Sequence, residues 1–314
     1  MSSVIGIDTS NYTTSVCVYD SANGTVYPSG KLLPVREGEL GLRQSDAVFE
    51  HVRQFGEVFS EIPSDVISDI SAVSVSVKPS ERDRSYMPCF LVGKCIAEAI
   101  SHTLNVPTYE FSHQAGHIMA ALYSANKREL IGKRFLAFHI SGGTTDLLLV
   151  DRSENDVFDC KLIGGSTDLK MGQATDRLGQ LLDLPFPSGR YLDELSKKST
   201  DVIPFKTNVK GLDCSISGFE NQFKSMLEGG ASAEDVAFSF FYALARVIVK
   251  LTVNARAEYG ELPVVFSGGV ASNSVIRSHI SDKLKNVWFA EPKFSSDNAA
   301  GIAILGYLRS VGEI

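Results

Sequence analysis

The sequence predicts an α/β fold of two similar lobes, each built around a mixed β-sheet. A strand–turn–strand unit occurs twice, as IGIDTSNYTTSVCVYD over residues 5–20 and as AFHISGGTTDLLLVDR over residues 137–152. Strand patterns alternate with helical patterns along the chain, which is typical of α/β proteins. A chain of 314 residues commonly folds as two domains. We expect a first lobe of residues 1–115 plus 291–314 and a second lobe of residues 116–290.

The first half of the chain begins with a predicted hairpin over residues 4–7 and 15–19, followed by the strong turn signal Asn23-Gly24. Apolar residues at helical spacing predict a helix over 46–60, and the alternating run SAVSVSV predicts a strand over 70–77. The remaining predicted elements are an extended segment over 31–34, a loop over 36–44, a helix over 90–104, a strand over 108–111 and a helix that starts at Ser112.

The second half repeats this order. It is predicted to form a hairpin over 135–150, a helix over 172–183, a loop over 185–190, long helices between 233 and 259, a strand over 263–267, a glycine turn and a helix, a strand over 287–290 and a last helix from about Asn298. The last helix is the candidate for an element that crosses back to the first lobe.

The composition favours an ordinary cytoplasmic protein. The five scattered cysteines form no CxxC pair, and the N-terminus lacks the pattern of a signal peptide. We find no run of about 20 apolar residues that would span a membrane. The formal net charge of −7 argues against a chain that grips a nucleic acid by itself, so an RNA contact would be local or supplied by a partner.

Each repeated unit carries a Thr-Thr pair in a turn of small hydroxyl residues, Thr13-Thr14 and Thr144-Thr145. Backbone N–H groups and hydroxyls in such turns are suited to holding phosphate. One turn in each half predicts two lobes that close on a nucleotide from both sides. The turns SGGTT (141–145) and SGGVASN (267–273) add glycines that let a ligand approach the backbone. Asp176, on a predicted helix, is a candidate partner for ribose hydroxyls or for a nearby arginine.

His113 and His117 stand in HQAGH on a predicted helix, where the i, i+4 spacing puts both imidazoles on one face. Gln114 stands where a zinc protease needs a glutamate, which disfavours that class. Asp297 could supply a third, carboxylate ligand or simply cap the last helix. Asp8, at the end of the first strand, could orient a metal-bound water or a phosphate, or it could cap a loop.

Taken together, these motifs resemble the TsaD family, the enzymes of tRNA N6-threonylcarbamoyladenosine synthesis once described as glycoproteases. The segments IGIDTS, HxxxH, ISGGTT, TDRLGQLLDLPFPSG, SISG, SGGVASN and SDNAAGIA follow the family's order along nearly the whole chain. HxxxH together with the C-terminal SDN is the specific part of the resemblance. The family has the two-lobed fold shared by actin, heat-shock chaperones and sugar kinases, called the ASKHA fold.

The resemblance implies a role for each matching residue. His113, His117 and Asp297 match ligands of one iron or zinc ion. Positions that hold an ATP- or AMP-type nucleotide, together with Mg²⁺, are matched by Ile140, Ser141, Gly142, Gly143, Thr144, Asp176, Gly189 and Asn273. The implied reaction transfers threonylcarbamoyl from its AMP adduct to N6 of the tRNA adenosine beside the anticodon. Asp8, which stands where the family has a glutamate, is our own candidate for a catalytic residue. The implied partners are the AMP-linked substrate, tRNA held through partner proteins, and a second copy or a paralogue in a dimer.

Several segments depart from the family's pattern and indicate a divergent paralogue. Asn11, Tyr12 and Thr13 replace a cysteine and acidic residues, and Thr144 replaces a histidine. Leu169-Lys170-Met171 stands near the place of an Asp-Asp run. Two alternatives therefore stay open: an ATP-binding kinase or ATPase of the same superfamily, and a non-catalytic partner paralogue.

Overall fold

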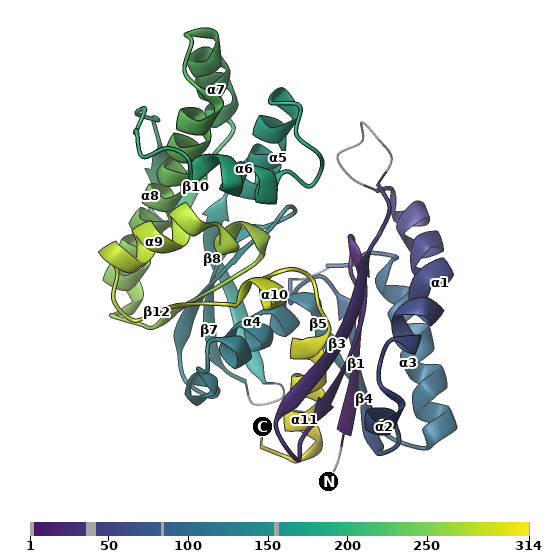
Figure 1. The fold of residues 1–314 in the computed structure, drawn as a ribbon. Helices are drawn as coiled ribbons and strands as arrows, with labels where there is room; N and C mark the ends of the chain where they lie inside the picture. Colours follow the sequence, from purple (N-terminus) through teal and green to yellow (C-terminus); the bar gives the residue numbers. More distant parts are fainter. Residues whose placement is uncertain (1–2, 36–41, 83–84, 154–156, 314) are drawn as a thin grey trace. The chain divides into compact units, whose positions relative to one another are not determined.

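The computed structural model describes residues 3–35, 42–82, 85–153 and 157–313. Contacts divide the chain into two units: Met1–Lys133 with Asp151–Cys160 and Lys293–Ile314 form the first, and Arg134–Val150 with Lys161–Pro292 form the second. Each unit has its own sheet and core, which are coloured by position along the chain in Figure 1. Most of the loop expected over 36–44 lies outside the described residues.

The first unit contains a five-stranded sheet with the strand order β3-β2-β1-β4-β5. β1 pairs antiparallel with β2 and parallel with β4, so the sheet is mixed, as predicted. The strands are β1 (Ser3–Thr9), β2 (Thr13–Asp20), β3 (Thr25–Leu32), β4 (Ile70–Lys78) and β5 (Thr108–Ser112), and the helices are α1 (Gln44–Ser60), α2 (Ser64–Ile67), α3 (Phe90–Leu104), α4 (His113–Ser124) and α11 (Ala300–Ser310), with a short 3-10 turn η1 (Arg128–Leu130).

Helices cover both faces of this sheet because its strands alternate two kinds of buried side chain. Ile5, Ile7 and Val75 pack in a cluster with Phe55 of α1 and Ala97 of α3. The opposite face carries small residues against α11, where the hydroxyl of Ser74 donates to the carbonyl of Ile302 at 2.8 Å. The C-terminal helix therefore returns to the first sheet, as the sequence suggested.

The crossing of α4 and α11 is the tightest helix contact in this unit that involves glycine. A Cβ atom built on Gly301 would lie 1.8 Å from the carbonyl oxygen of Gly116, and one built on Gly116 would lie 2.8 Å from Ile302. The contact at Gly301 is with backbone, so only glycine at this position lets the two helices approach this closely, whereas Gly116 leaves room for the side chain of Ile302. The crossing places the start of α4 beside the segment that leads into α11.

The second unit contains a seven-stranded sheet with the order β12-β11-β6-β7-β8-β10-β9. Its β6–β7 hairpin repeats the β1–β2 hairpin of the first unit, which confirms the predicted duplication. The strands are β6 (Phe135–Ile140), β7 (Thr145–Arg152), β8 (Phe158–Ser166), β9 (Asn208–Lys210), β10 (Asp213–Ser215), β11 (Val264–Ser267) and β12 (Val287–Phe289), and the helices are α5 (Met171–Leu181), α6 (Gly189–Ser196), α7 (Gly218–Glu228), α8 (Ala233–Tyr259) and α9 (Ser274–Lys283), with a 3-10 turn η2 (Gly269–Ser272). The short helix α10 (Pro292–Ser295) starts at the last residue of this unit and continues into the first unit.

The boundary between the units differs from the expected one. We expected the first lobe to end at residue 115, but this position falls inside α4, and the first unit continues to Lys133. The reason is the glycine crossing, which packs α4 against α11 at Gly116 and Ala120, beyond the expected boundary. The second expected boundary, after residue 290, lies two residues before the observed end of the second unit at Pro292.

Helix α8 corrects the expectation that no segment could span a membrane. Among the described residues it passes the length and composition test, with a mean hydropathy of 1.8 over its most apolar window. However, 67% of that window is buried inside the protein. Phe240, Leu244 and Ile248 of α8 belong to the core cluster of the second unit. α8 is therefore the core helix of this unit.

The glycine crossing gives a first prediction. Gly301→Ala should lower the free energy of unfolding by about 1–3 kcal/mol, because the new methyl group forces α4 and α11 apart. Gly56→Ala is the matched control: a Cβ at Gly56, on α1, meets no atom within 4 Å. This control should gain about 0.5–1 kcal/mol through helix propensity. Urea unfolding measures both changes, and equal stabilities of the two variants would contradict the tight crossing.

Candidate functional site

Three side chains of the first unit converge at the start of α4. Ser112 caps this helix, since its hydroxyl accepts a hydrogen bond from the backbone N–H of Ala115 at 3.2 Å, as the sequence predicted. The first turn of α4 therefore begins at His113, and His117 follows one turn later on the same face. Asp297 lies in the segment between α10 and α11, and its carboxylate faces both histidines.

The distances among these three residues are those of a metal centre. The two Nε2 atoms of His113 and His117 are 3.0 Å apart, and Asp297 Oδ1 lies 3.4 Å and 3.2 Å from them, respectively. A tetrahedral ion with ligand bonds of about 2.0–2.1 Å separates its ligand atoms by roughly 3.3 Å. Two imidazole nitrogens and a carboxylate oxygen thus suit one divalent zinc or iron ion in both spacing and chemistry.

Asp8 and Ser10 hold two of these ligands from the first hairpin. Asp8 Oδ2 lies 2.8 Å from Nδ1 of His113, and Asp8 Oδ1 accepts a hydrogen bond from Ser76. An imidazole that donates Nδ1–H to a carboxylate presents the lone pair of Nε2 to a metal. The hydroxyl of Ser10 donates to Asp297 Oδ2 at 2.6 Å, which leaves Oδ1 toward the histidines.

The structure therefore gives Asp8 a different position from the one that the sequence suggested. We expected a catalytic residue that orients a metal-bound water or a phosphate. Its side chain is fully buried and lies behind His113, on the side away from Nε2. Asp8 is thus placed to position a ligand. Asp297 likewise does not cap the last helix, because α11 begins at Ala300 and the carbonyl oxygen of the Asn298 side chain accepts from its N–H.

The charges of this cluster shift two pKa values in opposite directions. Burial opposes protonation of His113, but the carboxylates of Asp8 and Asp297 outweigh it and raise the pKa of His113 well above its usual value. Burial likewise opposes ionisation of Asp297, but His113 and His117 hold the pKa of Asp297 well below its usual value. Without a metal, a proton on His113 therefore offsets the buried negative charge.

The predicted nucleotide residues lie together in the second unit. The turn Ile140–Thr144 closes through a hydrogen bond from the backbone N–H of Ser141 to the carbonyl of Thr144, at 3.0 Å. A Cβ on Gly172 would lie 2.4 Å from the carbonyl oxygen of Ser141, and one on Gly268 would lie 2.3 Å from that of Ile140. The start of α5 and the turn SGGVASN (267–273) thus pack directly against the turn Ile140–Thr144.

Gly142 and Gly143 are exposed, and a Cβ at either would meet no atom within 4 Å. A ligand can therefore reach the backbone of this turn. Asp176 of α5 accepts a hydrogen bond from the backbone N–H of Ser188 at 2.9 Å, and this contact brings Asp176 next to Gly189 at the start of α6. Burial raises the pKa of Asp176.

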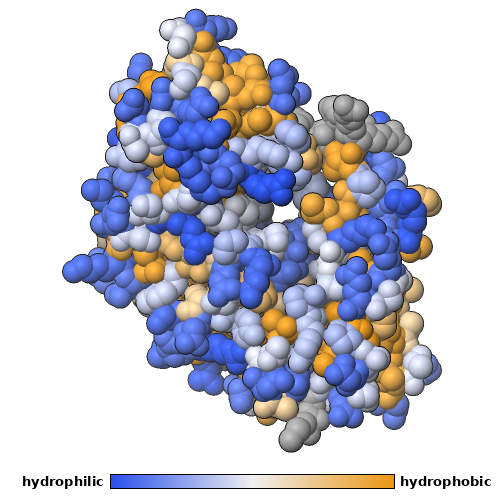
Figure 2. Space-filling model, in the orientation of Figure 1, coloured by the Kyte–Doolittle hydropathy of each residue, from blue (hydrophilic) through white to orange (hydrophobic). Residues whose placement is uncertain are grey.

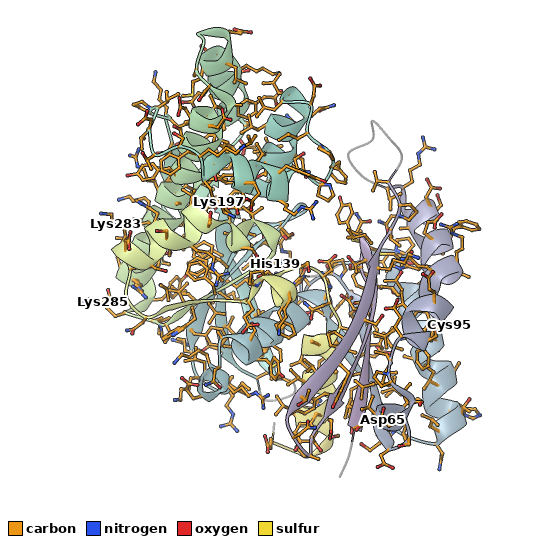
Figure 3. The ribbon with its side chains drawn as sticks, in the orientation of Figure 1. Asp65, Cys95, His139, Lys197, Lys283 and Lys285 are labelled. Atoms are coloured by element: carbon orange, nitrogen blue, oxygen red, sulfur yellow. The ribbon has the colours of Figure 1, made fainter. Side chains whose placement is uncertain are left out.

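Both polar atoms of the Asn273 side chain form hydrogen bonds within the protein. Its Oδ1 accepts the backbone N–H of Ile276 at the start of α9, and its Nδ2 donates to Asp193 Oδ1 at 2.7 Å. Asp193 also accepts from the hydroxyl of Ser274 and pairs with Lys197, which is labelled in Figure 3, at 2.9 Å. Asn273 therefore shapes the second glycine turn, and Asp193, which sequence reasoning missed, holds it.

Asp168 is a second residue that sequence reasoning missed. Its carboxylate accepts hydrogen bonds from the hydroxyls of Ser215 and Ser217, at 2.6 Å each, and from the backbone N–H of Ile216. Burial would raise the pKa of Asp168, but these hydroxyl donors lower it below its usual value. The segment SISG is thus tied to the loop before α5. The only sequence signal was the position of Asp168 in GGSTDLKMG.

The position of Asp8 gives a prediction for metal binding. Asp8→Asn should weaken zinc affinity by roughly 10- to 100-fold, because the neutral amide no longer favours the tautomer of His113 that offers Nε2. Competition with a chromophoric chelator measures this affinity. Asp65→Asn, which changes an acidic residue in the first turn of α2, is the control and should leave the affinity unchanged. An unchanged affinity in Asp8→Asn would contradict the positioning role.

The opposed pKa shifts predict how the stability of the metal-free protein depends on pH. His113 contributes most below its unfolded pKa of about 6.5, and this contribution is lost as the pH rises through the higher folded value. Asp297 contributes above its unfolded pKa of about 3.9, and its contribution is lost as the pH falls. Urea unfolding in chelator above pH 6.5 should show wild type losing stability relative to His113→Gln. Parallel curves would contradict the pKa shift.

Comparisons with known proteins point to one family. A family model described as "TsaD: tRNA N6-adenosine threonylcarbamoyltransferase" matches residues 47–304. The chain is 30% identical to the tRNA N6-adenosine threonylcarbamoyltransferase of Sulfurihydrogenibium sp. (strain YO3AOP1) over 318 aligned positions, covering 98% of this chain and 90% of the relative.

Solved structures share the fold at lower identity. Component A of (R)-2-hydroxyglutaryl-CoA dehydratase from Acidaminococcus fermentans has a TM-score of 0.58 at 16% identity, with 99% of this chain and 100% of that chain covered. A ROK family glucokinase from Streptomyces griseus has a TM-score of 0.54 at 12% identity, with 97% and 99% covered. The ASKHA fold predicted from the sequence is confirmed. Because the family model covers most of the chain and a relative is 30% identical over nearly its full length, the chain belongs to the TsaD family as a divergent member.

Proposed function

We propose that this protein is a metal-dependent transferase that moves threonylcarbamoyl from threonylcarbamoyl-AMP to N6 of the tRNA adenosine beside the anticodon. The observation that carries the proposal is the convergence of His113, His117 and Asp297, whose three ligand atoms lie 3.0–3.4 Å apart. Family membership supports it, since the matched relative carries the name of this activity.

His113, His117 and Asp297 would hold one iron or zinc ion, which when bound would supply Lewis acidity toward a carbonyl oxygen. Asp8 would keep the Nδ1 proton of His113 in place, so that Nε2 stays available as a ligand. Ser10 would fix the carboxylate of Asp297 through its hydroxyl. These residues orient the centre and would not themselves touch the transferred group.

The second unit would bind the AMP part of the substrate. The exposed backbone of Gly142 and Gly143, closed by Ser141 and Thr144, offers N–H groups and hydroxyls to phosphate. Asp176 would accept from ribose hydroxyls with the oxygen that does not bind Ser188. An ATP- or AMP-type nucleotide, accompanied by Mg²⁺, is therefore the proposed ligand of this turn.

The tRNA contact would be local or supplied through partner proteins in the cytoplasm, because the net charge is −7. A second copy of the chain or a paralogue would be one such partner. Figure 2 shows apolar patches among hydrophilic side chains on the visible face. Large apolar side chains of α1 and α3 are more than half exposed, at 63% for Phe49, 64% for Val52 and 52% for Leu91. Such side chains are suited to a protein partner.

A second candidate is an ATP-dependent kinase or ATPase acting on an unknown substrate. The open glycine turn favours it, because phosphate binding at Gly142 and Gly143 needs none of the three metal ligands. The converged triad favours the transferase, since neither a kinase of this fold nor a non-catalytic paralogue has a use for it. The two enzymes thus differ in their dependence on His113 and His117.

The test is a reconstituted assay with partner proteins, tRNA and threonylcarbamoyl-AMP, read by mass spectrometry of the tRNA nucleosides. Wild type should form N6-threonylcarbamoyladenosine, and His117→Ala should lower the rate at least about 100-fold because a ligand is lost. His102→Ala, which changes an exposed histidine of α3, is the matched control. Product formation that survives His113→Ala and His117→Ala would contradict the metal-dependent transferase, and ATP turnover in those variants would favour the kinase.

A further inference from the structure

A buried histidine on α1 lies close to the metal triad without belonging to it. His51 has no exposed surface, and its Nε2 lies 2.8 Å from the backbone carbonyl of Ser10. A carbonyl oxygen only accepts hydrogen bonds, so Nε2 carries the proton and donates. Nδ1 of the neutral ring is then an acceptor, and it lies 2.7 Å from the hydroxyl of Thr14.

The neighbouring groups fix the direction of each hydrogen bond. Gln54, one turn after His51, donates Nε2–H to Thr14 Oγ1 at 2.7 Å and to the carbonyl of Lys31 at 3.1 Å. The hydroxyl of Thr14 therefore donates to Nδ1 of His51. Burial lowers the pKa of His51, which agrees with a neutral ring. The network thus has one arrangement of protons.

Ser10 connects this network to the triad. Its carbonyl accepts from His51, while its hydroxyl donates to Asp297 Oδ2 at 2.6 Å. A single residue, Ser10, thus links His51 to Asp297 through hydrogen bonds. Adjacent contacts hold the same loop, since Thr9 donates to the carbonyl of Cys89 at 2.9 Å and Asn11 accepts from Gln44 at 2.5 Å.

We propose that His51 is a positioning residue of the metal centre, which fixes the Ser10 peptide so that the Ser10 hydroxyl orients the carboxylate of Asp297. The proposal rests on the metal site of the proposed function. A buried polar network could otherwise serve stability alone. His51 and Gln54 both belong to this network on α1, but they differ in one contact. His51 bonds to Ser10, whereas the hydrogen bonds of Gln54 go to Thr14 and Lys31. Gln54 is therefore the matched control.

The experiment measures Co²⁺ affinity of the metal-free full-length chain by visible absorbance, with thermal unfolding recorded for each variant. His51→Phe keeps a buried ring but cannot donate to Ser10, and should bind Co²⁺ about tenfold more weakly, at the low end of the range for outer-shell partners. His51→Gln keeps an N–H donor and should restore affinity to within about twofold of wild type. Gln54→Met should lose stability while keeping wild-type Co²⁺ affinity.

A double variant tests the route through Ser10. If His51 acts through this residue, Ser10→Ala with His51→Phe should bind Co²⁺ as weakly as Ser10→Ala alone. The Co²⁺ absorption spectrum should change in both single variants, because the orientation of Asp297 changes in each.

Wild-type affinity in His51→Phe would overturn the inference, and so would equal losses of affinity in His51→Phe and Gln54→Met. Additive losses in the double variant would overturn the route through Ser10. A wild-type chain that binds neither Co²⁺ nor Zn²⁺ would contradict the proposed metal site itself, and the positioning role would fall with it.

Discussion

The close crossing of α4 and α11 is the contact on which the candidate site depends. Gly116 and Gly301 allow the two backbones to meet, and the helices come from distant parts of the chain. On α4, His113 lies three residues before Gly116 and His117 lies directly after it. Asp297 lies four residues before Gly301. A larger residue at Gly301 would push the two backbones apart and separate these groups. The convergence of the three side chains therefore depends on helix packing as much as on the HxxxH motif.

The two hairpins share the antiparallel pairing of their strands but differ in the contacts that their turns make. In the first copy the hydroxyl of Thr14 is bound by His51 and Gln54, and Asp8 and Ser10 support the triad. In the second copy Gly142 and Gly143 stay exposed, and a Cβ at either would meet no atom of the described residues within 4 Å. The first hairpin thus carries residues that contact the triad, whereas the turn of the second hairpin is exposed. We predicted a phosphate-binding turn in each hairpin. The two turns are not equivalent, because the Thr14 hydroxyl in the first hairpin is already hydrogen-bonded within the protein.

Much of the fold and the triad could be predicted because both have strong local signals. The repeated hairpin, the helical period of α1 and the i, i+4 histidines can be recognised over short windows of sequence. The domain boundary could not, because it depends on the glycine crossing between α4 and α11. The same holds for Asp168 and Asp193, whose hydrogen-bond partners lie up to 81 residues away. Helix α7 and strands β8 to β10 were also missed: α7 is largely polar, β9 and β10 have three residues each, and β8 ends in the glycine pair Gly164-Gly165.

Anomalous diffraction from a crystal of the zinc-loaded protein tests the central claim most directly. The account predicts one strong peak about 2.0–2.2 Å from Nε2 of His113, Nε2 of His117 and a carboxylate oxygen of Asp297. It also predicts that Asp8 remains on Nδ1 of His113. A zinc peak at other residues, with the three side chains turned away from one another, would contradict the assignment of this cluster as a metal centre.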